Sequence, residues 1–306
     1  MARVFIGMAV YNGEKTIKET IDSLLNQTYT DFILFISDDA STDKTPKIAK
    51  EYSVKDRRVR YHRQEKNTGM FPNMKFVVDK ADTDYFMWSD CDDLYEIDFI
   101  RTCIELLEKN SAYSIAMTGA CNIDIQGRVI RYMPDVPYLS GKPTVLSVSR
   151  FLAQPETLGK CILMYSIFKT DAIKTLYKIY QQRSEWGTDY IFSLAMVSHY
   201  GVIIESKLLF KKRMGGASDS ERETRAPGEM IIIKNPKNRM FPVGGGRFKR
   251  FLNSNLEAVE GTPYKFLVLF ILCIRSIRAW FLFLKNRNYK KRFNKITSIF
   301  IRSRKK

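Results

Sequence analysis

Residues 85–93 read YFMWSDCDD, an aromatic and apolar run that leads directly into an acidic turn. Three carboxylates, those of Asp90, Asp92 and Asp93, fall within four positions. A short apolar run that ends in polar residues is typical of a buried strand. Like charges at this density repel each other, and a hard cation such as Mg²⁺ or Mn²⁺ would relieve the repulsion. The alternative is a solvated acidic turn that caps the next helix.

Two earlier apolar runs end in the same way. Residues 4–10 are followed by Tyr11, and residues 32–37 are followed by Asp38 and Asp39. Helical spacing between the runs gives the order strand, helix, strand, which predicts a parallel sheet with right-handed crossovers. Ligands of such sheets bind beyond the carboxyl ends of the strands. We therefore expect the three polar loops to meet at one edge of an α/β fold.

The same patterns predict the remaining elements. Strands are expected at residues 4–10, 32–37, 59–62, 85–88, 114–121, 129–132, 162–168 and 202–212. Helices are expected at residues 14–26, 44–52, 72–81, 97–108 and 188–198. Residues 215–246 are rich in Gly, Pro, Ser and charge, which predicts a mobile loop.

The positive charge of the chain is concentrated near its C-terminal end. The formal net charge is +17, and residues 248–306 hold 15 Lys/Arg and two acids against 35 and 31 in residues 1–247. A nucleic-acid cleft would need basic residues on the folded body, so no nucleic-acid partner is expected. The five cysteines are scattered without CxxC spacing, which favours a reducing, cytoplasmic compartment over a disulfide framework or a zinc site.

The end of the chain has the composition of a membrane-surface segment. Residues 264–284 are rich in Phe, Leu, Ile and Trp, but Arg275 and Arg278 interrupt them. Arginines are costly in a spanning helix, so an amphipathic helix in the interface is expected. Residues 285–306 add ten Lys/Arg, which an anionic cytoplasmic leaflet would attract. This predicts a cytoplasmic protein, peripheral on the inner face of the cell membrane. A helix packed on the body and a spanning helix are the alternatives.

Taken together, the motifs resemble glycosyltransferase family 2, the inverting transferases with the GT-A fold, of the type that builds bacterial surface polysaccharides. The matching segments are residues 9–12 (AVYN), 37–43 (SDDASTD), 67–69 (NTG), 90–95 (DCDDLY) and 185–190 (EWGTDY). The resemblance implies a GT-A domain over residues 1–214, with a mostly parallel nucleotide-binding sheet flanked by helices. A flexible loop near the acceptor site at 215–247 and a basic tail of amphipathic helices at 248–306 complete the expected organisation.

The resemblance also implies a nucleotide-sugar donor, expected to be a UDP-sugar. Ala9 and Tyr11 belong to the loop that would hold the nucleobase, with Tyr11 stacking on the base. Asp39 would accept a hydrogen bond from a base N–H, with Asp38 in reserve. Asp90 would contact the ribose. The acceptor would be a hydroxyl group of a glycan or of a lipid-linked molecule.

In the same resemblance, Asp92 would bind one Mn²⁺ or Mg²⁺ ion, and Asp93 would add a secondary contact. The ion would stabilise the departing diphosphate. Asp189 would act as the general base on the acceptor hydroxyl, with Glu185 as the fallback base. Trp186 would line the acceptor site. By itself, Asp189 would instead be an acid favoured by the positive end of a helix dipole.

The chain departs from the family pattern in the strand after the proposed base. Many relatives carry a histidine there, whereas residues 209–214 read LFKKRM, so Arg213 or Lys212 would offset the diphosphate charge. The sequence leaves two other functions open. A nucleotidyltransferase usually opens with a Gly-rich, basic loop, which this chain lacks. A non-catalytic membrane-bound scaffold would not need Asp39, Asp92 and Asp189.

Overall fold

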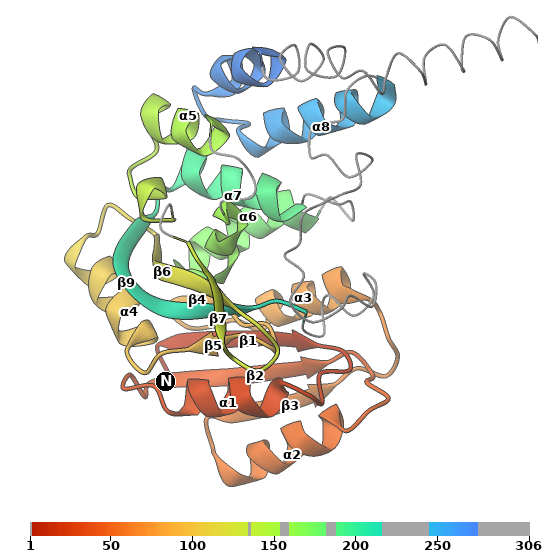
Figure 1. The fold of residues 1–306 in the computed structure, drawn as a ribbon. Coiled ribbons are helices and arrows are strands. Elements are labelled where there is room, and N and C mark those ends of the chain that lie inside the picture. The colour runs from red at the N-terminus through yellow and green to blue at the C-terminus, as the bar shows by residue number, and fades with distance from the viewer. Residues whose placement is uncertain (1, 134–135, 154–158, 182–187, 216–244, 275–306) are drawn as a thin grey trace, which may run out of the picture. The chain divides into compact units, whose positions relative to one another are not determined.

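The computed structural model describes residues 2–133, 136–153, 159–181, 188–215 and 245–274 (Figure 1). The chain divides into two compact units, Met1–Ile231 and Ile232–Lys306, and each is described by itself. The first unit is an α/β structure built around one large sheet, as the order of apolar runs predicts.

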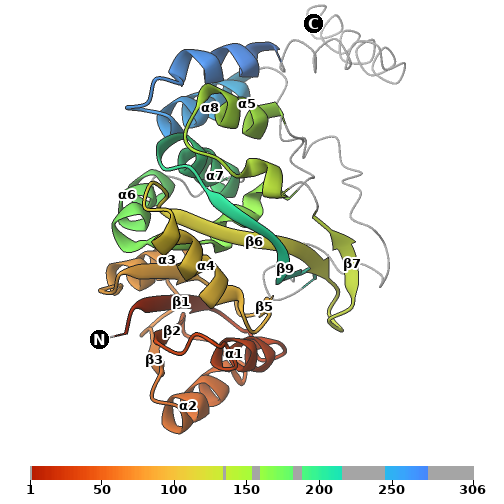
Figure 2. The ribbon, with the colours of Figure 1, turned by 90° about the vertical axis from the view of Figure 1, so that its left-hand side faces the viewer.

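The sheet has nine strands in the order β3-β2-β1-β4-β8-β6-β9-β5, with β7 beside β6. The strands are β1 (Val4–Val10), β2 (Phe32–Asp38), β3 (Val59–Arg63), β4 (Tyr85–Trp88), β5 (Leu94–Tyr95), β6 (Ile115–Ile123), β7 (Val129–Tyr132), β8 (Ile167–Lys169) and β9 (Ile203–Arg213). Strands β3, β2, β1 and β4 are parallel, so their carboxyl ends share one edge. Beyond β4 the sheet is mixed, because β8 runs antiparallel to both of its neighbours. Figure 2 shows β6 and β9 side by side in this part of the sheet.

Helices cover both faces of this sheet. Helices α1 (Ile17–Leu25), α2 (Thr45–Lys55) and α4 (Phe99–Lys109) contribute to one continuous apolar core. Helices α3 (Met70–Asp79) and α6 (Thr170–Gln181) pack on strands of the sheet and on each other. Helix α7 (Thr188–His199) packs against α6, against α5 (Val145–Ala153) and against the 3-10 turn η3 (Lys160–Tyr165). A second 3-10 turn, η1 (Val136–Leu139), packs on β9.

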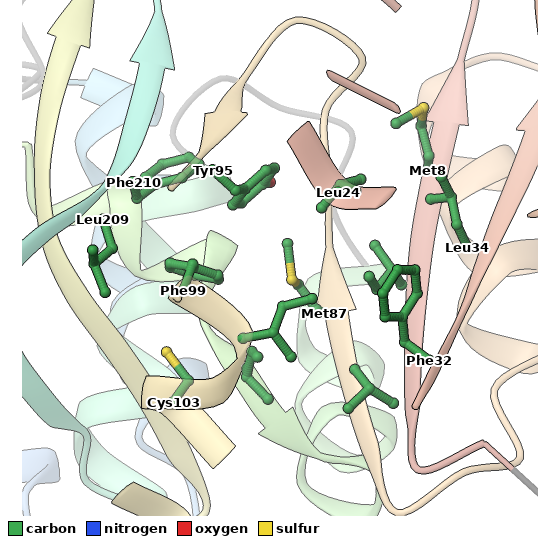
Figure 3. Packing of buried hydrophobic residues seen from close by; sticks show 14 of the residues in the cluster. Met8, Leu24, Phe32, Leu34, Met87, Tyr95, Phe99, Cys103, Leu209 and Phe210 are labelled. Atoms are coloured by element: carbon green, nitrogen blue, oxygen red, sulfur yellow. The ribbon is translucent and has the colours of Figure 1, made fainter. Parts of the chain in front are cut away.

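Alternation along β1 divides its side chains between two sides. Val4, Ile6, Met8 and Val10 join the main core, which continues to Tyr95, Phe99 and Phe210 at the far end of the sheet (Figure 3). On the other side of β1, a Cβ atom on Gly7 would lie 2.2 Å from Val77 Cγ1 of α3. Glycine at position 7 therefore lets α3 lie close on the sheet.

The structure corrects several element predictions. Strands β4 and β7 have the expected bounds, but residues 162–168 are not one strand, since η3 occupies Lys160–Tyr165 and β8 only Ile167–Lys169. A short buried apolar run does not distinguish a strand from a buried helical turn by its pattern. Helices α5 and α6 and the short strand β5 were not predicted.

The second unit contains α8 (Gly245–Ala258) and a helical segment at residues 265–274. Val268 and Leu272 are buried on that segment, whereas Phe266, Phe270 and Ile274 are exposed by 84%, 64% and 48%. Within the described ranges, every helix falls short of the length and apolar character that a membrane crossing requires. Most of the predicted loop at 215–246, and the basic residues 285–306, lie outside the described residues.

Candidate active site

The loops that follow β1 and β2 are joined by hydrogen bonds. The backbone N–H of Asp39 donates to the carbonyl of Val10 at 2.8 Å. The N–H of Asn12 donates to Ser41 Oγ at 2.9 Å, and the N–H of Thr42 donates back to Asn12 Oδ1 at 2.8 Å. These reciprocal bonds fix the two loops against each other at the carboxyl edge of the sheet.

The loop after β4 lies against the loop after β1. A Cβ atom on Gly13 would stand 2.9 Å from Cys91 Sγ, so the two loops touch at this glycine. Asn12 and Ala40 both adopt positive φ angles, 54° and 59°, which non-glycine residues rarely adopt and which cluster at functional sites. The three polar strand ends therefore converge, as the parallel order predicts.

The two neighbouring acids of the second loop have different surroundings. Asp38 is fully buried and accepts hydrogen bonds from Tyr61 Oη at 2.8 Å and from Arg63 Nη1 at 2.7 Å. The Asp39 carboxylate instead accepts from the N–H and Oγ1 of Thr68 and from the N–H of Gly69, at 2.8–2.9 Å. Asp38 thus fastens β2 to β3, and Asp39 holds the loop that precedes α3.

Tyr11 and Ala9 lie at the end of β1. The Tyr11 side chain is 43% exposed just past the strand. Ala9 pairs with Ser37 within the parallel register, one residue before the end of β1. The Asp39 N–H bonds the carbonyl of Val10, the residue before Tyr11, so the two residues belong to joined loops. An exposed aromatic ring can stack on a planar ligand, and a carboxylate can accept a hydrogen bond from it.

The acidic turn after β4 is compact. One oxygen from each of Asp90, Asp92 and Asp93 lies within 4.8 Å of the others. Asp92 and Asp93 are buried, with exposed fractions of 1% and 0%. Carboxylate oxygens are the ligands that Mg²⁺ and Mn²⁺ prefer, so this donor set fits such an ion.

Lys212 of β9 lies beside these carboxylates. Its Nζ atom is 2.8 Å from Asp90 Oδ2 and 3.1 Å from Asp93 Oδ2. The ammonium also lies 4.6 Å from the centre of the Tyr165 ring, and Tyr165 Oη donates to Asp90 Oδ2 at 2.6 Å. When all three carboxyl groups are ionised, one ammonium leaves two negative charges, which one divalent cation would balance.

The two carboxyl groups that contact Lys212, those of Asp90 and Asp93, have pKa values shifted in opposite directions. Burial raises the pKa of Asp93 to about 8, against the opposing charge of Lys212. Burial would also raise the pKa of Asp90, but the Lys212 ammonium outweighs it and holds that pKa below its usual range. Burial lowers the pKa of Lys212, but the charges of Asp90 and Asp93 outweigh burial. The pKa of Lys212 therefore lies well above its ordinary value.

Arg213 stabilises the acidic turn mainly through backbone groups. Its side chain bonds the main chain of the turn. Its backbone N–H donates to Asp93 Oδ1 at 2.9 Å, and Nε donates to the backbone carbonyl of Asp92 at 2.8 Å. The remaining nitrogens reach the carbonyl of Ile125 at 2.7 Å and the Glu19 carboxylate at 2.5 Å. The side chain is buried. Of the two basic candidates, Lys212 is therefore the one that lies at the acids.

The structure places Asp189 in the first turn of α7, where it is exposed. Helix α7 packs on η3, whose last residue is the Tyr165 that contacts Asp90. Glu185 and Trp186 lie outside the described residues. Sequence reasoning missed Tyr165, since the segment was predicted as a strand, and nothing in the pattern around it pointed to the acids.

Comparisons with known proteins identify a matching family and similar chains. The family model described as glycosyl transferase family 2 matches residues 5–176. The chain is 34% identical over 137 residues to EpsE of Bacillus subtilis, which is named as a glycosyltransferase, covering 44% of this chain and 49% of EpsE. It is 35% identical over 127 residues to chondroitin synthase of Escherichia coli, covering 42% of this chain and 18% of that protein. The chain thus spans half or less of the length of these relatives.

Solved structures show the same fold. The S. aureus TarS fragment 1–349, crystallised with UDP-GlcNAc, superposes with a TM-score of 0.62 at 15% identity, covering 88% of this chain and 70% of that one. The complex of the same fragment with UDP gives a TM-score of 0.61 at 16% identity, covering 88% and 69%. The expected GT-A architecture is confirmed by this likeness. The family model covers more than half of this chain, so the chain belongs to glycosyl transferase family 2.

Proposed function

We propose that this protein transfers a sugar from a nucleoside-diphosphate sugar, a UDP-sugar in the first instance, to an acceptor hydroxyl with inversion, using one divalent cation. The observation that carries the proposal is the three-carboxylate turn after β4, which lies against the loop after β1, and that loop is hydrogen-bonded to the loop after β2. A nucleotide bound at these loops would bring its diphosphate to the acids.

In this proposal Tyr11 stacks on the base, Ala9 belongs to the segment that holds the nucleotide, and Asp90 contacts the ribose. Asp39 accepts a base N–H. Three donor groups from described residues engage its carboxylate, which has about four acceptor sites, so room for one more donor remains. The solved TarS structures with UDP and UDP-GlcNAc support a donor of this class.

Asp92 and Asp93 would hold Mn²⁺ or Mg²⁺, with Asp92 as the principal ligand. Such an ion neutralises charge that develops on a leaving diphosphate. The chain's own contribution is to hold the acids in a compact turn. Arg213 fastens that turn through the Asp92 carbonyl and the Asp93 carboxylate. Lys212 is the residue that we assign to offset diphosphate charge, in place of Arg213.

Asp189 would accept the proton of the acceptor hydroxyl as that oxygen attacks the anomeric carbon. Its exposure at the start of α7 leaves it accessible to an acceptor. Glu185 is the fallback base, and Trp186 would line the acceptor site. A carboxylate remote in sequence from the acidic turn suits this division of labour, since one group of acids serves the leaving group and another serves the nucleophile.

We further propose a peripheral position on the inner, cytoplasmic face of the membrane, with a lipid-linked or surface glycan as acceptor. Phe266, Phe270 and Ile274 recur every four residues and are exposed, so they form one apolar stripe on a helix. The sequence that follows, residues 275–306, holds 12 Lys/Arg and no acids. An apolar stripe next to dense positive charge suits an anionic lipid surface.

The function is tested by incubating the purified chain with Mn²⁺ and a panel of nucleotide sugars and measuring the released nucleoside diphosphate. We expect release with one donor class, and its loss in Asp92→Ala while the variant keeps its circular dichroism spectrum. Release of pyrophosphate from a nucleoside triphosphate, with transfer of the nucleotidyl group to an added sugar phosphate, would indicate a nucleotidyltransferase instead. Silence with every donor and acceptor extract would favour a scaffold.

A further inference from the structure

The ammonium of Lys212 lies between two carboxylates of the acidic turn, and one of them, Asp93, is a proposed contact of the cation. Nζ lies 2.8 Å from Asp90 Oδ2 and 3.1 Å from Asp93 Oδ2. Its side chain is 17% exposed, and the Tyr165 ring lies on the ammonium at 4.6 Å. A carboxylate oxygen in contact with an ammonium offers its lone pairs less readily to a second cation, and two cations this close repel each other.

We propose that Lys212 is a positioning residue whose ammonium group competes with the divalent cation for Asp93, and so sets the metal affinity of the site. This inference rests on the proposed function for the presence of a metal site. It adds a specific consequence, which is that the chain carries a built-in competitor for the cation beside the acidic turn.

Removal of Lys212 would not release the two acids. Tyr165 Oη still donates to Asp90 Oδ2 at 2.6 Å, and the Arg213 N–H still donates to Asp93 Oδ1 at 2.9 Å. The geometry of the turn is therefore held by other donors, and what a neutral residue at position 212 removes is mainly the positive charge. Loss of repulsion then outweighs loss of preorganisation, so the metal binds more tightly.

Lys211 supplies a matched control. It is the preceding residue of β9, so its side chain points to the opposite side of the strand, where its Nζ pairs with Glu96 at 2.5 Å. Lys211→Met removes the same charge from the same strand without touching the acidic turn.

The experiment titrates Mn²⁺ into the full chain without nucleotide or acceptor and measures free Mn²⁺ by electron paramagnetic resonance. We expect Lys212→Met and Lys212→Gln to bind Mn²⁺ at least about tenfold more tightly than the wild type, a difference of about 1.4 kcal/mol, and Lys211→Met to bind as the wild type does. The larger rise in melting temperature on adding Mn²⁺ to the Lys212 variants gives a second readout.

Equal or weaker binding by both Lys212 variants, or no Mn²⁺ binding by any variant, would overturn the inference. Lys212→Gln keeps a hydrogen-bond donor, so it covers the case in which Lys212→Met fails to fold. The test is separate from turnover. A chain that transfers sugar with Mn²⁺ but shows no effect of Lys212 refutes this inference alone, whereas a chain that transfers none can still show the predicted order of Mn²⁺ affinities.

Discussion

Arg213 donates from Nε to the backbone carbonyl of Asp92 at 2.8 Å, so the acidic turn after β4 is fastened by a residue 121 positions away on β9. The same arginine binds the Asp93 carboxylate through its backbone and Glu19 of α1 through its guanidinium. Arg213 thereby connects β9, the acidic turn and α1. Its role is structural support of the site, so its removal should lower the free energy of unfolding.

We expect Arg213→Ala to lower the free energy of unfolding by about 3 kcal/mol, because the buried Asp92 carbonyl loses its donor and the ion pair of the buried guanidinium with Glu19 is broken. The exposed partner, Glu19, is solvated and limits the loss. Urea unfolding followed by circular dichroism measures it. Arg128→Ala is the control, since that side chain is 75% exposed and should cost no more than about 0.5 kcal/mol. Equal losses in both variants would contradict the buried-support role.

Asp189 is tested against a residue in the same helical position. We expect Asp189→Asn to reduce kcat by about 10²–10⁴-fold, the usual contribution of a general base, while the Kd for the nucleoside diphosphate stays unchanged. Asp171 lies in the first turn of α6 and provides the control. If Asp171→Asn and Asp189→Asn have the same small effect, Asp189 is only an acid at a helix N-terminus.

The first half of the fold could be predicted because each apolar run there ends in polar residues, and the parallel order then brings the ends together. Asp39 and the acids at 90–93 were placed at one edge for this reason. Beyond β4 the sheet becomes mixed, and pairing between β6, β8 and β9 depends on contacts that no local pattern encodes. Helices α5 and α6 were missed in that part of the chain.

The sequence does not predict which of the Lys212 and Arg213 side chains faces the acids. Both were candidates for offsetting the diphosphate charge, and adjacent strand residues point to opposite sides. Which one faces the acids depends on the register of β9 with β6, where Asn122 pairs with Lys212 after two irregularities. The pairing, and hence the choice, could be read only from the structure.

Gly7 gives a test of the packing between β1 and α3. A methyl group there would meet Val77 Cγ1 at 2.2 Å, so we expect Gly7→Ala to destabilise the chain by about 1–3 kcal/mol through overpacking. Val77→Ala should relieve the clash, and the double variant should therefore lose less free energy of unfolding than the two single losses combined. Additive losses in urea unfolding would show that the helix lies farther from the strand than this geometry requires.

The membrane proposal can be tested at the exposed apolar stripe of the second unit, Phe266, Phe270 and Ile274. We expect Phe266→Ser with Phe270→Ser to reduce binding to vesicles of anionic lipid at least about tenfold, since each buried aromatic side chain contributes about 1.5–3 kcal/mol when it leaves water. Flotation of the full chain with the vesicles measures the bound fraction. Val54→Ser with Val145→Ser removes two comparably exposed apolar residues of the first unit and should leave flotation unchanged. If both pairs float as the wild type does, basic charge alone accounts for any attachment, and high salt should then abolish it. A stripe that enters the lipid should instead retain part of its binding at high salt, because apolar burial is not screened.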